Sequence, residues 1–326
     1  DGSLSLVDRR ILTTQRSSVP TGYTTVFDKV TVVGGRGSLS TKRNRVVSVR
    51  QAKDTFVVRV TKRTEGYFGI VQLHEFVAYA NDGSCSIVAP SQGENGKGSP
   101  YGGNPVKIEF IGDSLSCAYG NEGKSPCTFT PDTENAQESF VVKSALKVDP
   151  NAIYNIVCYS GKGVVRNYGD KEPVSKDPMP TYYNRTLTTR NAVWDFKAFT
   201  PDIVVITLGG NDFSTEPRPS YEQYSAGYNR FIDYIQSVYG HKRIPIVAAC
   251  GPLFWNCYGN FTQRVVEERG DDMVSFLSMK GLFEGEYPGP EYGCDAHPSV
   301  LGAEKMSNLM APHIRSVLAK HSKKQH

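Results

Sequence analysis

The sequence lacks any uninterrupted apolar run of the roughly 18 residues that a membrane-spanning helix needs, which argues against a membrane anchor. It also lacks a strong excess of charge: the formal net charge is +4, and lysine and arginine are scattered outside the C-terminal tail. A chain without a basic cluster is a poor candidate for binding nucleic acid. Hydrophobic residues make up 39% and charged residues 21%, which is typical of a globular domain.

The seven cysteines include no CxxC pair, and no cysteines and histidines stand at the spacing of a zinc site. We therefore expect no metal or other cofactor, and disulfides or buried thiols instead. Their odd number means that at least one cysteine is free or pairs with another molecule. Cys250 with Cys257, or Cys257 with Cys294, could brace loops near the candidate site, and spacing alone does not decide between these pairs.

The first residue is Asp1 rather than methionine, as expected of a mature product after signal-peptide cleavage and equally of a trimmed chain. Two glycosylation sequons occur, Asn184-Arg185-Thr186 and Asn260-Phe261-Thr262. Together these features predict a secreted, extracellular glycoprotein.

A length of 326 residues favours two domains, although one large domain remains possible. Short β-rich runs fill the first part, near residues 23–33, 46–50, 55–61 and 67–79. In the third run, Phe56, Val58 and Val60 alternate with Val57, Arg59 and Thr61, which is the period of a strand. We interpret residues 1–100 as a small all-β sandwich domain with a linker.

The Gly- and Pro-rich segment 90–105 marks the domain boundary, because it is too poor in apolar residues to belong to a core. Beyond it, strands alternate with helices. Strands are expected at 106–111, 152–158, 202–208, 244–249 and 273–279, and helices near 136–147, from 221 onward and at 300–318. This rhythm predicts an open parallel α/β sheet in a second domain, residues 101–326.

Four chemically active groups lie at the expected strand ends, where an open parallel sheet binds its ligands. Ser114 follows the first strand, Gly161 the second and Asn211 the third, and His297 precedes the last helix. A hydroxyl, a glycine amide, a carboxamide and an imidazole are the groups that acyl transfer by a serine nucleophile requires.

Each group has a definite role in that chemistry. Ser114 attacks the ester carbonyl once His297 has accepted its proton, because a free hydroxyl is a weak nucleophile. The backbone N–H groups of Ser114 and Gly161 and the Asn211 side-chain amide form the oxyanion hole, in which one donor typically contributes about 10²–10³ in rate. Of the six histidines, only His297 sits in a strand-to-helix loop, before Pro298.

These blocks resemble, in the same order, those of the SGNH (GDSL-type) hydrolase superfamily over about residues 106–318. The segments GDS at 112–114, SGKG at 160–163 and DAHPS at 295–299 are similar to the second family of carbohydrate esterases. The resemblance implies a three-layer α/β/α SGNH hydrolase domain, preceded by a jelly roll that helps to wall the substrate cleft. It also implies an acetyl xylan esterase-like enzyme that removes acetyl groups from polysaccharides or sugars.

The spacing of the acid departs from the superfamily pattern, which has aspartate three residues before the histidine. Here Asp295 stands two residues before His297. We expect Asp295 to complete a catalytic triad by orienting the ring. In the alternative, a backbone carbonyl holds the ring and leaves a Ser–His dyad, an arrangement known in the resembled family.

The aromatic residues Trp255 and Phe213 are expected to contact a sugar ring, although most aromatic side chains belong to the core. The expected partner is an acetylated polysaccharide or oligosaccharide, with no nucleic acid, membrane or obligate protein partner. One alternative function is a lipase or thioesterase that uses the same groups. An alternative of another class is an inactive carbohydrate-binding protein in which the β-sandwich acts as a lectin.

Overall fold

The computed structural model divides the chain into two compact units, residues 1–96 and 97–326. Side chains are described for residues 62–69, 104–187, 192–239, 244–253 and 256–321. For residues 4–5, 31–32, 37–41, 45–52, 55–61, 190–191, 254–255 and 322, only the backbone is described.

The described strands of the first unit are antiparallel. They are β1 (Leu4–Ser5), β2 (Thr31–Val32), β3 (Gly37–Thr41), β4 (Arg45–Ala52) and β5 (Thr55–Lys62). β1 pairs with β2, and β3, β4 and β5 form a three-stranded sheet in that order. The runs expected at 46–50 and 55–61 are therefore strands.

The run expected at 67–79 does not begin as a strand. Tyr67 lies in a one-turn 3₁₀-helix, η1 (Gly66–Phe68), which ends at Gly69 with φ 99°. A positive φ is readily adopted by glycine and stops an extended run. The rest of that run, and most of the run at 23–33, lie outside the described residues, so the jelly roll stays a prediction.

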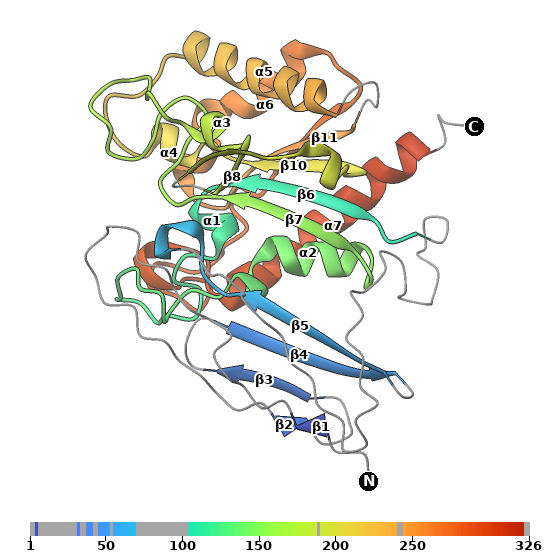
Figure 1. Cartoon of the computed structure of the whole chain (residues 1–326). Helices are drawn as coiled ribbons and strands as arrows, with labels where there is room; N and C mark the ends of the chain where they lie inside the picture. Colours follow the sequence, from blue (N-terminus) through green and yellow to red (C-terminus); the bar gives the residue numbers. More distant parts are fainter. Residues whose placement is uncertain are drawn as a thin grey trace. The chain divides into compact units, whose positions relative to one another are not determined.

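Five parallel strands build the second unit, in the order β12-β11-β10-β6-β7 (Figure 1). Their bounds are β6 (Lys107–Gly112), β7 (Ile153–Cys158), β10 (Ile203–Thr207), β11 (Ile246–Cys250) and β12 (Val274–Ser278). The predicted α/β fold with a parallel sheet is confirmed, and each of the five strands lies within two residues of its expected bounds.

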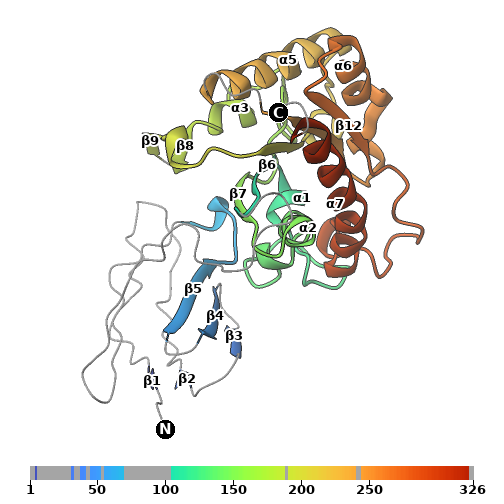
Figure 2. The same cartoon turned by 90° about the vertical axis from the view of Figure 1, so that its right-hand side faces the viewer.

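Helices cover both faces of this sheet (Figures 1 and 2). α2 (Phe140–Val148) and α7 (Val300–Ser322) pack on one face, and α5 (Tyr221–Val238) and α6 (Phe261–Arg269) pack on the other. Strand residues alternate between the two cores, so Phe110 faces the first and Ile111 the second. Burial on both faces explains why these strands are apolar at nearly every position.

The sequence of α5 explains why this segment forms a helix. Ser220 and Gln223 form a capping box at its start. Its buried positions recur at three- and four-residue steps, which gives one apolar face to the sheet. They are Tyr224, Gly227, Tyr228, Phe231, Ile232 and Ile235.

The sequence pattern predicted neither the helix α6 nor the remaining elements, which are short connections. They are α1 (Ser114–Cys117), η2 (Ala136–Glu138), α3 (Met179–Tyr182), β8 (Arg185–Leu187), β9 (Arg190–Val193), η3 (Phe196–Ala198), α4 (Gly210–Phe213), η4 (Phe254–Asn260) and η5 (Cys294–Ala296). A helix of one turn contains no apolar period from which it could be recognised. None of the helices within the described part of the chain is both long and apolar enough to cross a bilayer.

The second unit contains three disulfides: Cys117–Cys158, Cys127–Cys294 and Cys250–Cys257. Of the two pairs that the sequence left open, Cys250–Cys257 is therefore confirmed and Cys257–Cys294 is wrong. Cys85 lies outside the described residues.

The strand order fixes where a ligand would bind. From β6 the chain proceeds to its neighbour β7 and later to β10, on the opposite side of β6. Such a reversal of direction opens a crevice between the two loops at the carboxyl ends of the strands. The residues that follow β6 and β10 therefore face a shared space, and they include Ser114 and Asn211.

Candidate active site

The loop after β6 presents Ser114 at the start of α1. The Asp113 carboxylate caps this turn by accepting the Leu115 N–H at 3.0 Å. Gly112 leaves no room for a side chain, because a Cβ at this position would lie 2.0 Å from Oγ of Ser116. Ser114 is only 8% exposed, so its hydroxyl lies in a sheltered position.

The imidazole of His297 bridges the nucleophile and a backbone carbonyl. Its Nε2 lies 2.7 Å from Oγ of Ser114, and its Nδ1 lies 3.0 Å from the carbonyl oxygen of Asp295. A carbonyl only accepts, so Nδ1 carries the proton and Nε2 is left to accept from the serine hydroxyl. The backbone of His297 is extended, with φ −75° and ψ 160°, as expected for a residue before proline.

The His297 ring hydrogen-bonds to the backbone carbonyl of Asp295 and not to its carboxylate, so the expected triad contact does not form. Asp295 has φ 48° and ψ 43°, and Ala296 also has a positive φ of 59°. This left-handed turn directs the Asp295 carbonyl at Nδ1, while the carboxylate accepts a hydrogen bond from Oη of Tyr119 at 2.5 Å. The geometry is that of the Ser–His dyad held by a backbone carbonyl.

The surroundings of His297 favour its neutral form. Burial lowers its pKa from the usual 6.5 to about 4, although part of the residue reaches solvent. The hydrogen bond to the Asp295 carbonyl and the negative charge of Asp295 act in the opposite direction. A neutral imidazole is the form that accepts a proton from serine.

Two backbone donors lie at the ends of β6 and β7. Gly161 has φ 82°, which a residue with a side chain rarely adopts, and the atom nearest to a Cβ there would be Cβ of Tyr168 at 4.0 Å. Among the residues that the structure describes, the N–H groups of Ser114 and Gly161 donate to no acceptor. Both therefore remain available to a developing oxyanion.

The Asn211 side chain connects its own loop, after β10, with the loops that follow β6 and β7. Its amide nitrogen donates to the carbonyl of Lys162 at 2.9 Å and to the Asp113 carboxylate at 3.2 Å. An oxyanion would therefore share the amide hydrogens of Asn211 with these two acceptors. The oxyanion role of Asn211 stays a prediction.

Asp212 fixes the loop that carries Gly161. Its carboxylate is fully buried and accepts the backbone N–H groups of Val164, Val165 and Arg166 at 3.0, 2.7 and 2.9 Å. Burial raises the pKa of Asp212 to about 6, against the opposite influence of these donors. Asp212 thus holds the Gly161 loop against α4.

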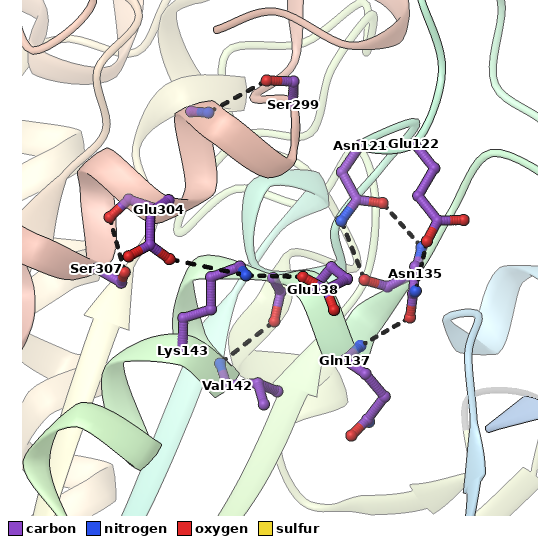
Figure 3. Close-up of polar contacts among 12 residues, drawn as sticks. Asn121, Glu122, Asn135, Gln137, Glu138, Val142, Lys143, Ser299, Glu304 and Ser307 are labelled. Carbon is purple, nitrogen blue, oxygen red and sulfur yellow. Dashed lines mark hydrogen bonds and ion pairs between the residues drawn. The ribbon is translucent and has the colours of Figure 1, made fainter. Parts of the chain in front are cut away.

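The segment after the nucleophile turn is held by hydrogen bonds among Asn121, Glu122 and Asn135, which Figure 3 shows, and by a backbone bond to the helix that follows His297. Asn121 donates to the carbonyl of Asn135 at 3.1 Å and accepts the Asn135 N–H at 2.9 Å, while Asn135 also donates to Glu122 at 2.6 Å. The carbonyl of Asn121 accepts the N–H of Val300, the first residue of α7. These bonds connect the Ser114 side of the site with the His297 side.

The aromatic residues near the site differ from expectation. Phe213 is 2% exposed and stacks on Tyr258 at 4.8 Å, so it is a core residue and the expected sugar contact is wrong. It lies one position after Asp212, on the inward face of α4. The side chain of Trp255 lies outside the described residues. Tyr119 and Tyr168 also lie near the strand ends, but the sequence ranks them below Trp255 and Phe213 as sugar contacts, since nothing in their spacing distinguishes them from core aromatics.

Comparison with known proteins shows to which family the chain belongs. Residues 108–310 match the GDSL-like lipase/acylhydrolase family, which is more than half of the chain. The chain belongs to this family. The matched range contains Ser114, Gly161, Asn211 and His297.

Individual members of the family show a closer similarity. The chain is 32% identical over 263 residues to the cellulase/esterase CelE of Acetivibrio thermocellus, covering 79% of this chain and 29% of that protein. It is 29% identical over 225 residues to an acetylxylan esterase / glucomannan deacetylase of Cellvibrio japonicus, covering 64% of this chain and 59% of that protein. This chain therefore spans less than two thirds of either relative.

A solved structure agrees with these matches. A family two carbohydrate esterase from Clostridium thermocellum, in complex with cellohexaose, is 31% identical with a TM-score of 0.65. The similarity covers 81% of this chain and 75% of that one. The resemblance to the second family of carbohydrate esterases is therefore confirmed.

Proposed function

We propose that this protein is a carbohydrate O-acetyl esterase, with Ser114 as nucleophile and His297 as general base. The observation that carries the proposal is the 2.7 Å distance between Oγ of Ser114 and Nε2 of His297. That distance lies within the range in which an imidazole accepts a hydroxyl proton.

In the first half-reaction, Oγ of Ser114 bonds to the acetyl carbonyl carbon while its proton moves to Nε2 of His297. The carbonyl oxygen becomes negatively charged and accepts from the N–H groups of Ser114 and Gly161. Collapse of this intermediate breaks the bond to the sugar oxygen, which takes the proton from Nε2. The products are the free sugar hydroxyl and acetyl-Ser114.

In the second half-reaction, water attacks the acetyl group while Nε2 accepts one of its protons. Collapse returns that proton to Oγ of Ser114 and releases acetic acid. The Asp295 carbonyl stabilises the imidazolium in both halves through the Nδ1–H bond. No metal or redox step is needed for this sequence.

A sugar is the substrate class that two features support. The similar proteins described above are named acetylxylan esterase, glucomannan deacetylase and carbohydrate esterase. In addition, Tyr168 is 62% exposed, and its N–H donates to the Gly161 carbonyl at 2.8 Å. An exposed aromatic face beside the oxyanion donors suits the apolar face of a sugar ring. Trp255 remains a second predicted sugar contact.

Secretion is part of the same proposal. Three disulfides among the described residues suit an oxidising compartment. Of the two sequons, Asn260 is exposed and Asn184 is half-buried, so Asn260 is the more accessible acceptor. Endoglycosidase treatment of protein secreted from a eukaryotic host should lower its mass, whereas an unchanged mass would contradict glycosylation.

We further propose that the first unit is a jelly roll, with the hydrolase domain beginning near residue 101. The antiparallel sheet β3-β4-β5 supports this proposal, since jelly rolls are built from antiparallel strands. A crystal structure of the whole chain would test it. A second antiparallel sheet packed on the first is the expected result, and a single open sheet would contradict it.

The function is tested by acetate release from acetylated xylan and acetylated glucomannan, compared with a long-chain lipid ester and an acyl thioester. The expected result is rapid release from the polysaccharides and its loss in Ser114→Ala. Faster cleavage of the lipid ester or the thioester would overturn the carbohydrate assignment. Sugar binding without any hydrolysis would overturn the enzyme assignment.

A further inference from the structure

Tyr119 is attached directly to the nucleophile turn. α1 ends in a Schellman motif, in which the Ala118 N–H donates to the Leu115 carbonyl and the Tyr119 N–H donates to the Ser114 carbonyl at 3.0 Å. Ala118 supplies the left-handed residue of this motif, with φ 72°. The motif therefore fixes the backbone of Tyr119 relative to the nucleophile.

The ring of Tyr119 lies between two other rings. It stacks on the His297 imidazole with a centroid distance of 4.0 Å and an interplanar angle of 20°. On its other side it stacks on Phe129 at 3.9 Å and 12°. An imidazole held against a supported ring cannot tilt freely, so this stack sets the plane in which Nε2 points at Ser114.

The hydroxyl of Tyr119 contacts Asp295, the residue whose carbonyl holds the imidazole. It donates to the Asp295 carboxylate at 2.5 Å, which is a charge-assisted hydrogen bond. Asp295 and Ala296 both have positive φ, a strained conformation for residues with a side chain, which persists only when neighbours hold it. The bond to Tyr119 is one such restraint, and the Asp295 N–H donating to the Cys127 carbonyl at 3.1 Å is another.

We propose that Tyr119 is a positioning residue that acts through Asp295, and that the pair aligns the His297 ring with Ser114. The proposal rests on the esterase function proposed above. Tyr119 holds the Asp295 carboxylate, and the left-handed turn then aims the Asp295 carbonyl at Nδ1. The Asp295 carboxylate thus serves catalysis through Tyr119 rather than by contact with the imidazole.

The test uses three variants: Tyr119→Phe, Asp295→Ala and the double variant. Tyr119→Phe keeps the ring stack and removes only the hydroxyl. We expect each single change to lower kcat by about 10- to 100-fold, the range that loss of a charged hydrogen bond implies. KM should change little, because the proposal places neither the Tyr119 hydroxyl nor the Asp295 carboxylate in contact with the substrate. The double variant should be no worse than either single one, since both remove the same interaction.

A matched control is available at Tyr221, the first residue of α5. Tyr221 donates to the Glu268 carboxylate at 2.5 Å, and its ring packs against Phe261 and Arg264 rather than against a site residue. Tyr221→Phe removes a bond of the same kind and should leave kcat unchanged. If Tyr119→Phe also leaves kcat unchanged, or alters KM alone, the proposal is wrong. A loss of about 10⁴-fold in Asp295→Ala that greatly exceeds the loss in Tyr119→Phe would instead identify the carboxylate as a triad member.

A second readout does not depend on catalysis. The ¹⁵N chemical shifts of the His297 ring report which nitrogen carries the proton. In the Ser114→Ala background the ring should be protonated at Nδ1, and adding Tyr119→Phe should populate the other tautomer. An unchanged tautomer would overturn the positioning role even if the protein cleaves esters. A changed tautomer in a protein that cleaves no ester would leave the positioning role standing and overturn the proposed function alone.

Discussion

His297 donates from Nδ1 to the carbonyl oxygen of Asp295 across 3.0 Å, so a peptide dipole holds the ring where a triad would use a carboxylate. A dipole fixes the tautomer as well as a charge does, but it stabilises the imidazolium less. The ring is therefore both oriented for catalysis and kept neutral by its surroundings. The consequences concern the pH dependence of the reaction and the residues that hold the loops.

The first prediction concerns the pH profile. Because burial lowers the pKa of His297 to about 4, the ring stays neutral and able to accept a proton below pH 6.5. We expect kcat/KM to fall only as the pH drops toward this lowered value. Rates between pH 3 and pH 8 with a soluble acetate ester check this. An acidic limb centred at 6.5 or above would contradict the lowered pKa.

The second prediction concerns Gly161. In Gly161→Ala the backbone must leave its φ of 82° or carry strain, which would displace the N–H that we propose as an oxyanion donor. We expect kcat to fall by about 10²–10³-fold with little change in KM, as for loss of one oxyanion donor.

A suitable control is Gly270→Ala. Gly270 has a similar φ of 61° and no neighbouring atom within 4 Å of the added Cβ. It ends α6, so its substitution should affect thermal stability slightly and kcat not at all. Equal loss of kcat in both variants would show that backbone strain alone, and not the donor, explains the effect.

The third prediction concerns the Cys127–Cys294 disulfide, which lies next to Asp295 and closes a separation of 167 residues. Replacing both cysteines with alanine should destabilise the protein by about 2–5 kcal/mol and lower kcat, because it frees the loop before His297. The Cys250–Cys257 pair closes only 7 residues and should matter less to stability. Urea unfolding of both double variants checks the order, and the reverse order would contradict it.

The fourth prediction concerns Asp212. Asparagine cannot accept three backbone N–H groups with one carbonyl oxygen, so Asp212→Asn leaves buried donors unpaired. We expect a loss of stability of about 2 kcal/mol or more. Asp195→Asn is the matched control, because Asp195 caps the exposed turn η3 and asparagine caps equally well. Comparable losses in both variants would contradict the role given to Asp212.

The sheet and the long helices follow from the sequence because their apolar residues repeat. β10 has five buried residues in succession, and α5 has one buried face, so each pattern fits only one type of secondary structure. The one-turn helices α1 and α4 have no such pattern. Their place is fixed by the strands before them and by hydrogen bonds such as those of Asp113.

The functional residues were predictable to different degrees, because only some of them can be recognised from residue type and position. Ser114 and His297 follow from residue type and from their place at strand ends. The contact of Asp295 depends on its φ rather than on its side chain, and no residue pattern encodes a left-handed aspartate. The position of Phe213 beside Asn211 and Asp212 predicts a contact with the substrate, whereas α4 turns its ring into the core.

The most direct test of the account is covalent labelling of the intact protein with an organophosphate that reacts only with activated serine. Peptide mapping by mass spectrometry should locate a single adduct on Ser114. His297→Ala should abolish the adduct, because the hydroxyl then has no base. An adduct on another serine, or labelling of Ser114 that persists without His297, would contradict the central claim.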